Sequence, residues 1–304
     1  MREMTVGKND AGQRLDRFLA KAVPLLPGTL VQKYIRTKRI KVDGKRTERN
    51  YRLIEGDTIQ LYIGDAFFET AAATERYRTI TEPKLAVCYE DDAILIVDKP
   101  PGLLSHSGDD PNEVTLADLV KAYLYRSGQW KPDSEQSFVP ALCNRLDRNT
   151  GGLVLAAKTA EAQRDLNAKI RAREVDKYYL LAVHGRPAPE AGRIEGHLVK
   201  DSTQNHVSVA EAGAQDAKDA VTEYRTLETK GDVSLVECKL ETGRTHQIRA
   251  QMAALGCPLL GDRKYGGGGD EPYQALWAYR VCLDEREFYS GDVPFLDRYF
   301  DYKL

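Results

Sequence analysis

The chain has 304 residues, of which 42% are hydrophobic and 30% charged, a composition typical of a soluble protein with one large and one small domain. Its apolar runs fall short of the roughly 20 residues that a membrane helix needs, and its N-terminus lacks a signal-peptide core. We therefore expect a cytoplasmic protein that does not enter a membrane. Five cysteines, an odd number without a CxxC pair, argue against a disulfide framework and a structural zinc site.

The charge is distributed unevenly along the chain. Residues 1–63 hold 14 Lys and Arg against 7 Asp and Glu, a net charge of +7, whereas the remainder carries −9. A basic N-terminal segment indicates contact with a polyanion such as a nucleic acid. A basic face that is merely solvated would give the same count.

The N-terminal segment has the pattern of a small α/β unit. Residues 13–22 carry apolar side chains at spacings of three and four, which predicts a helix, and a second helix is expected to begin near Thr29 as its cap. Asp43-Gly44 predicts a hairpin turn, and residues 57–63 a strand. This order resembles the alpha-L RNA-binding domain first known from a ribosomal small-subunit protein. The resemblance implies that residues 1–63 bind RNA, and the basic side chains expected to do so are Lys33, Arg36, Lys38, Arg39 and Lys41.

Residues 64–84 show no clear period and are expected to form a linker, although Phe67 and Phe68 indicate that part of it packs on a neighbour. From residue 85 to 304 the pattern is that of one larger domain. Predicted strand pairs outnumber strand–helix–strand units there. The fold class expected is α+β, with a mixed, largely antiparallel sheet and flanking helices.

One stretch of this domain, "NRLDRNTGGL" at 144–153, sets a single carboxylate between two arginines. Arg145 and Arg148 lie close enough in sequence to favour the ionised form of Asp147. The following glycine pair permits a sharp turn or a close approach of another backbone. From these residues alone, Asp147 is either the working group of an enzyme or a structural ion pair.

Three stretches match one family in the right order: "ILIVDKPPGLLSHSG", "NRLDRNTGGLVLAAKT" followed by "KYYLLAVHG", and "TGRTHQIRAQMAALGCPLLGDRKYG". Together they resemble pseudouridine synthases of the RluA type over residues 85–283. The resemblance implies a central cleft in which uridine of RNA is isomerised, without a cofactor or a metal. Two positions depart from the family pattern. Asn144 replaces its usual His, and Trp277 stands in "LWA" where "LHA" is usual.

The resemblance also assigns roles to side chains. Asp147 matches the essential aspartate, which either attacks the anomeric carbon or removes a sugar proton. Arg244 matches the arginine that pairs with it, and Ile248 would follow on the same helical face. Tyr179 matches the active-site tyrosine. Stacking suits it better than base catalysis, since an ordinary tyrosine pKa is near 10, and Tyr178 should point to the opposite sheet face. Further possible contacts with RNA or with the base are Asn144, Arg145, Arg148 and His106.

Structural roles are the alternative for several of these side chains. Arg145 and Arg148 either grip phosphates or orient the loop. His106 and His246 are expected to be structural, and Lys99 is expected to be a charge at a strand end.

Other functions compete with this interpretation. A glycoside hydrolase also acts at an anomeric carbon but usually needs two carboxylates, and only one stands out here. A non-catalytic RNA-binding or ribosome-assembly protein with the same fold is a second alternative. For an active enzyme, the expected partner is ribosomal RNA of the large subunit, or its precursor particles, with transfer RNA as the other target. We expect the protein to be a monomer.

Overall fold

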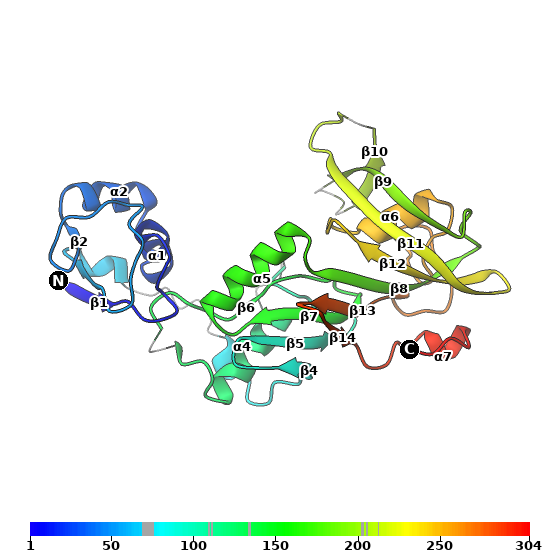
Figure 1. Cartoon of the computed structure of the whole chain (residues 1–304), viewed down its shortest axis with the longest axis horizontal. Coiled ribbons are helices and arrows are strands. Elements are labelled where there is room, and N and C mark those ends of the chain that lie inside the picture. Colours follow the sequence, from blue (N-terminus) through cyan, green and yellow to red (C-terminus); the bar gives the residue numbers. More distant parts are fainter. Residues whose placement is uncertain are drawn as a thin grey trace.

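The computed structural model describes residues 1–68, 76–108, 110, 112–132, 135–201, 204, 206–211 and 213–304. It contains two sheets of unequal size. A three-stranded sheet belongs to the N-terminal unit, which lies at one end of the long axis in Figure 1, and an eleven-stranded sheet forms the large body. Within the described part of the chain, no helix is long and apolar enough to cross a membrane.

The N-terminal unit is built around two helices and a small antiparallel sheet. Its elements are β1 (Arg2–Thr5), α1 (Leu15–Ala22), α2 (Gly28–Arg36), β2 (Ile40–Val42) and β3 (Thr58–Leu61), with strand order β1-β3-β2. The apolar face predicted for residues 13–22 is buried in α1. Thr29 does not cap α2, because the helix begins one residue earlier, after Pro27. Asp43 and Gly44 both have positive φ and form the predicted turn, across which Val42 bridges Lys45. The strand that pairs with β2 as a whole is β3.

The predicted linker contributes to both bodies. η1 (Asp65–Phe68) brings Phe67 and Phe68 onto the core of the N-terminal unit, as predicted. α3 (Arg76–Thr79) buries Tyr77 in the main core of the large body, where its ring packs on Trp130. Residues 69–75 lie outside the described residues.

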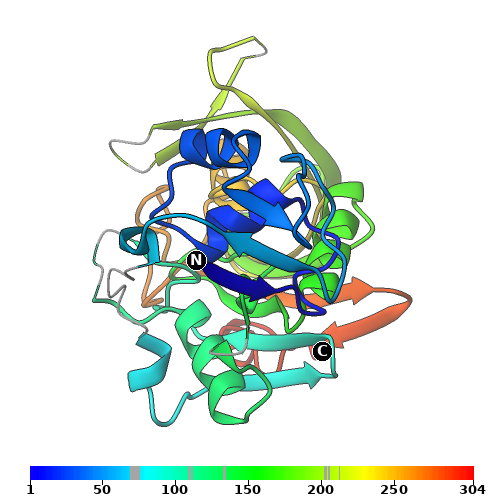
Figure 2. The same ribbon diagram turned by 90° about the vertical axis from the view of Figure 1, so that its left-hand side faces the viewer.

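Side chains of the N-terminal unit also touch the large body directly. The Asn9 amide donates to Glu135 (2.8 Å) and accepts from the backbone N–H of Ala160, the first residue of α5. Gln13 donates to Ser137 (2.8 Å). Figure 2 shows the unit in front of the large body when viewed along the long axis.

The large body follows the predicted fold class, α+β with a largely antiparallel sheet. Its strand order is β10-β9-β11-β12-β8-β13-β7-β5-β4, with β14 paired to β13 and β6 to β7, and the β13–β7 pair is parallel. The strands are β4 (Ala86–Glu90), β5 (Ile94–Lys99), β6 (Ala141–Leu142), β7 (Gly151–Ala157), β8 (Asp176–His184), β9 (Ala191–Asp201), β10 (His206–Ala210), β11 (Lys218–Lys230), β12 (Val233–Leu240), β13 (Leu276–Leu283) and β14 (Arg286–Tyr289).

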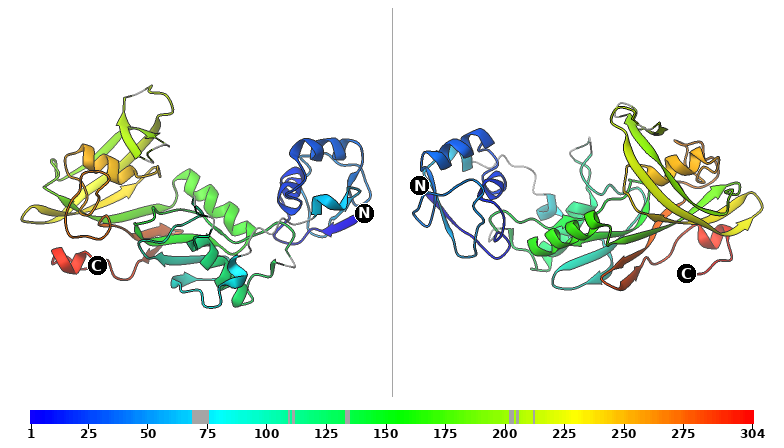
Figure 3. Two further views of the ribbon diagram at one scale, coloured as in Figure 1. Left: turned by 180° about the vertical axis from the view of Figure 1, so that it is seen from behind. Right: turned by 45° about the horizontal axis from the view of Figure 1, so that its top comes forward.

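Four helices accompany this sheet: α4 (Leu116–Arg126), α5 (Ala160–Ala172), α6 (Gln247–Ala254) and α7 (Leu296–Tyr299). Figure 3 shows α4 and α5 with strands β4 to β7 in the half nearer the N-terminal unit, and α6 with β9 to β12 in the other half. Strand β8 runs through both halves. Its Tyr179 lies in the core on one sheet face and Tyr178 packs on the cluster at the other, as the strand period predicted.

Candidate active site

The loop that carries Asp147 is held in place by backbone hydrogen bonds on both sides. The Ser105 hydroxyl donates to the carbonyl of Leu146 (2.8 Å) and accepts from the N–H of the same residue (3.1 Å). The Asn144 amide accepts from the N–H of Leu155 on β7 (2.7 Å). Asn144 therefore ties the loop to the sheet and orients it.

Lys99 anchors the same loop through hydrogen bonds to backbone carbonyls. Its ammonium group donates to the carbonyls of Pro100, Leu103 and Arg148 at 2.8–2.9 Å, and its side chain is fully buried. Burial lowers the pKa of Lys99 to about 8, although the negative charge of Asp147 opposes this shift. Lys99 is the last residue of β5, as the prediction of a strand-end charge required, and its charge is buried among three carbonyls.

The glycine pair after the loop lets β7 approach β13 closely. A Cβ on Gly151 would lie 2.2 Å from the Trp277 ring, and one on Gly152, whose φ is +112°, would lie 2.2 Å from the carbonyl oxygen of Ala278. The Trp277 indole donates to Ser290 (2.6 Å). Trp277 therefore fills the space that two small residues leave behind the loop, which gives this departure from the family pattern a structural consequence.

Asp147 faces α6 and the residue that precedes it. Its Oδ2 lies 3.4 Å from Nη1 of Arg249 and 3.8 Å from Nε2 of His246. Arg249 in turn makes a bidentate pair with the buried Asp262, with contacts of 2.6 and 2.8 Å. The bidentate geometry fixes the plane of the guanidinium, so that one of its N–H groups points to Asp147.

The predicted partner of Asp147, Arg244, does not make this contact. Its Nε donates to the carbonyl of Asp219 (2.9 Å), and it lines the same cavity from the rim. The helix begins only at Gln247, after His246 with φ of 53°, so the helical spacing assumed for Arg244 does not hold. Ile248 is buried and lines the cavity as expected.

The two arginines that flank Asp147 in sequence also do not pair with it. Arg148 forms an ion pair with Glu113, while its carbonyl receives the Lys99 bond. Arg145 is exposed and lines the cavity. The positive charge beside Asp147 thus comes from Arg249, a residue 102 positions away.

The loop and α6 enclose a cavity of about 340 Å³ with Asp147 in its wall. Tyr179 is buried at this cavity, and burial together with the charge of Asp147 raises the pKa of its phenol far above the ordinary value. A phenol with so high a pKa is a poor base at neutral pH. His106 is exposed and does not line the cavity, and the pKa of its ring is lowered by partial burial and by the charges of Arg145 and Lys121.

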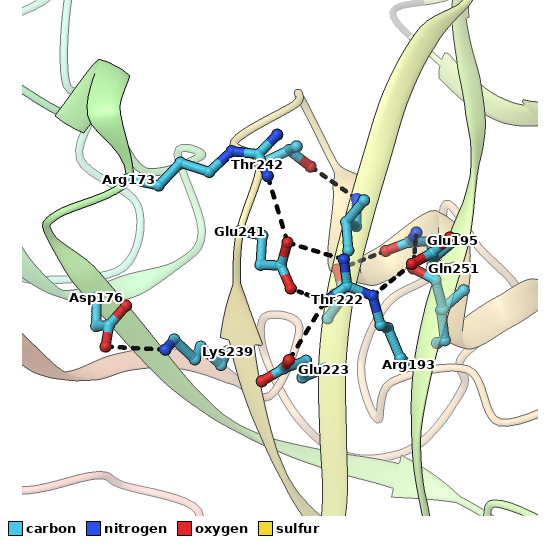
Figure 4. A network of polar contacts seen from close by, with 12 residues as sticks. Arg173, Asp176, Arg193, Glu195, Thr222, Glu223, Lys239, Glu241, Thr242 and Gln251 are labelled. Atoms are coloured by element: carbon cyan, nitrogen blue, oxygen red, sulfur yellow. Dashed lines mark hydrogen bonds and ion pairs between the residues drawn. The ribbon is translucent and has the colours of Figure 1, made fainter.

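Glu241, which lines the cavity, belongs to a network of charges (Figure 4). Glu241, which follows β12, pairs with Arg193 of β9 and with Arg173 at the end of α5. Arg193 also reaches Glu195 and Glu223. These pairs join the α5–β8 turn to the loop before α6. Among the described residues, no group of three or more His, Cys, Asp or Glu is arranged to hold a metal ion.

These observations describe an RNA-modifying enzyme of one family. Residues 93–254 match the model of the RNA pseudouridylate synthase family, and the chain belongs to that family of isomerases. The family and the fold class predicted from the sequence are therefore confirmed.

Relatives extend over most of the chain. An uncharacterised RNA pseudouridine synthase of Bacillus subtilis is 30% identical, covering 87% of this chain and 82% of the relative. The ribosomal large subunit pseudouridine synthase D of Xanthomonas campestris is 33% identical over 88% and 75% of the two chains. The solved human RNA pseudouridylate synthase domain containing 1 has 25% identity and a TM-score of 0.54, covering 71% and 86% of the two chains.

Proposed function

We propose that this protein isomerises uridines of large-subunit ribosomal RNA, with Asp147 acting at the glycosidic centre of a flipped-out nucleotide. The observation that carries the proposal is the position of the carboxylate. Two carboxylates, Asp147 and Glu241, line the cavity, which has the size of a small-ligand site. Glu241 forms ion pairs with Arg193 and Arg173, whereas Asp147 lies beside the Arg249 guanidinium in the loop that the resemblance marks as catalytic. Relatives named as ribosomal large subunit pseudouridine synthases support the choice of RNA.

The reaction breaks the N-glycosidic bond, turns the uracil, and joins its carbon five to the sugar, after which the proton on that carbon leaves. An ionised Asp147 serves either attack on the anomeric carbon or removal of a sugar proton, and Arg249 fixes its orientation in both cases. Tyr179 supplies a flat apolar surface for the base. The target base must leave its stack to reach this cavity.

We propose that the N-terminal unit supplies sequence-independent affinity for RNA. Lys33 and Arg36 line a groove of about 580 Å³ together with Arg46 and Arg49, which suits a phosphodiester backbone. The other predicted contacts lie outside that groove. Arg39 lies over the ring of Tyr34 and Lys41 over that of Tyr62, while Lys38 has a positive φ after α2.

The test of the catalytic proposal is tritium release from ribosomal RNA labelled at carbon five of uracil. Wild type and the surface control Asp165→Ala should release tritium, whereas Asp147→Ala and Asp147→Asn should not. Both naked RNA and precursor ribosomal particles should be offered. No release by the wild type from either would favour a non-catalytic RNA-binding protein, and release from transfer RNA alone would move the target to that RNA.

A matched test addresses the groove. Replacing Lys33, Arg36, Arg46 and Arg49 by alanine should weaken RNA binding and flatten its dependence on salt, because each lost phosphate contact removes about 0.7–0.9 from the slope of log affinity against log salt. The rate at saturating RNA should stay the same. We also propose that the enzyme works as a monomer in the cytoplasm.

A further inference from the structure

Both partners of Asp147 are held by one short turn, residues 261–267. Gly267 donates its N–H to the carbonyl of Asp262 (2.9 Å), and a Cβ on Gly267 would lie 1.7 Å from the carbonyl oxygen of Leu259. This close turn presents two side chains to α6. Asp262 holds Arg249, and Tyr265 reaches His246.

The hydrogen bonds of Tyr265 favour one tautomer of His246. Its hydroxyl oxygen accepts from the backbone N–H of Val207 on β10 (2.9 Å) and lies 2.9 Å from Nδ1 of His246. Since the backbone N–H can only donate, the phenolic proton is free to go to Nδ1, which then acts as an acceptor. With its proton on Nε2, a neutral His246 accepts a hydrogen bond from Tyr265 at Nδ1 and turns an N–H toward Asp147 at 3.8 Å. The other tautomer would turn a lone pair toward the carboxylate, so the geometry favours the Nε2–H form.

The ring of Tyr265 is fixed from two sides. It stacks on His206 of β10 with centroids 4.7 Å apart, and the Arg249 guanidinium lies 5.0 Å from its centroid. One side chain thus contacts the β9–β10 hairpin and both groups that face Asp147.

We propose that Tyr265 is a positioning residue for catalysis, which holds the Nε2–H tautomer of His246 toward Asp147 and ties this arrangement to the β9–β10 hairpin. The proposal rests on the proposed catalytic function of Asp147. Tyr265 itself touches no reacting atom in this scheme, and its effect passes through His246.

The groups around His246 agree with a neutral ring. Burial lowers its pKa to about 4; the negative charges of Asp147 and Asp262 act against the shift, and the positive charges of Arg249 and Lys264 add to it. Removing the Tyr265 hydroxyl leaves Nδ1 without its donor. The ring is then free to take up a proton there or to exchange tautomers, so the N–H toward Asp147 is no longer held.

The experiment compares wild type with Tyr265→Phe, which keeps the ring and loses the hydroxyl. The nitrogen signals of His246 in NMR spectra should show the Nε2–H tautomer in wild type from pH 6 to 8. In the variant they should show mixed tautomers. In tritium release, kcat should fall about tenfold, as expected for the loss of one orienting hydrogen bond, with KM within twofold of wild type.

Tyr224→Phe is the matched control, because its hydroxyl donates to a backbone carbonyl, that of Pro189, away from the cavity. It should leave the His246 signals and kcat unchanged. In a His246→Gln background, Tyr265→Phe should cause less than a twofold further loss. A full tenfold loss there would overturn the proposal, because the hydroxyl would then act independently of His246.

Finding the Nδ1–H tautomer in wild type would also overturn it, whatever the variants do. The two proposals can fail separately. Tritium release by Asp147→Ala would refute the catalytic role of Asp147. If Asp147→Ala released no tritium but the His246 signals were unchanged in Tyr265→Phe, only the positioning role would be refuted.

Discussion

The two walls that meet at Asp147 are built by different kinds of bond. The loop 144–150 is held by bonds to its backbone, from the ammonium of Lys99 and the hydroxyl of Ser105. The opposite wall is held by bonds between side chains, Arg249 to Asp262 and His246 to Tyr265. The loop wall fixes the position of the Asp147 carboxylate, and the opposite wall orients the Arg249 and His246 side chains that face it. We therefore expect damage to the first wall to act on folding and activity together, and damage to the second to act mainly on activity.

The largest effect is expected from Lys99→Met, which removes the amine that three carbonyls share. The carbonyl of Arg148 keeps the N–H of Gly102 as a donor, whereas those of Pro100 and Leu103 lose the Lys99 bond. Unsatisfied buried acceptors cost about 1–3 kcal/mol each, so we expect a loss of roughly 3 kcal/mol in the free energy of unfolding after the gain from removing a buried charge. The loop should then no longer hold Asp147 in position, and tritium release should fall at least a hundredfold. Urea unfolding and release at low temperature measure the two effects. The exposed Lys200→Met should change neither, and a stable, active Lys99→Met would contradict the anchoring role.

Gly151→Ala should come next, because the added methyl group would overlap the Trp277 ring. We expect a cost of about 2–3 kcal/mol, typical of overpacking in a core. In a Trp277→Leu background, where the ring is gone, the same change should cost about 1 kcal/mol or less. Gly196→Ala, at a glycine with open space, is the control. Equal costs in both backgrounds would mean that strain in the backbone, and not the ring, requires Gly151.

Asp262→Asn breaks the opposite wall at its strongest pair. One carboxylate oxygen becomes an amide, so Arg249 loses half of its bidentate contact and its plane is no longer fixed. We expect kcat to fall about tenfold with little change in KM, and stability to fall by about 1–2 kcal/mol. Asp176→Asn, at the more exposed pair with Lys239, should leave kcat unchanged. A loss of stability as large as that of Lys99→Met would remove the distinction between the walls.

The two walls also differed in how well the sequence predicted them. The resemblance assigned Asp147 and Tyr179 to one site, and the structure brings both to one cavity. It also assigned Arg244 as the partner of Asp147, whereas in the structure Arg249, further along the same motif, makes this contact. The helix does not extend back to Arg244 because His246 has a positive φ, and no sequence pattern predicts this conformation at a residue other than glycine. The position of Lys99 at a strand end was predicted, but its burial was not, because one of its three partners is a carbonyl 49 residues away.

Lowering the pH should distinguish the stability contributions of the two walls without a substitution that changes packing. The unfolded chain takes up a proton on His246 as the pH falls through the ordinary value of 6.5, whereas the folded chain does not until about pH 4. Stability is therefore lost over this window, and between pH 7 and pH 5 the share of His246 is about 2 kcal/mol. Between the two pH values, the free energy of unfolding of His246→Gln, measured with urea, should fall by about 2 kcal/mol less than that of wild type.

Lys99→Met provides the comparison for that measurement. The pKa of Lys99, at about 8, lies well above this window, so its amine stays charged from pH 7 down to pH 5 and the loop wall takes up almost no proton. The Lys99→Met variant should consequently be less stable than wild type by nearly the same amount at both pH values. If it lost the acid sensitivity while His246→Gln kept it, the proton uptake would belong to the loop wall and the assignment of His246 as the buried neutral base would be wrong.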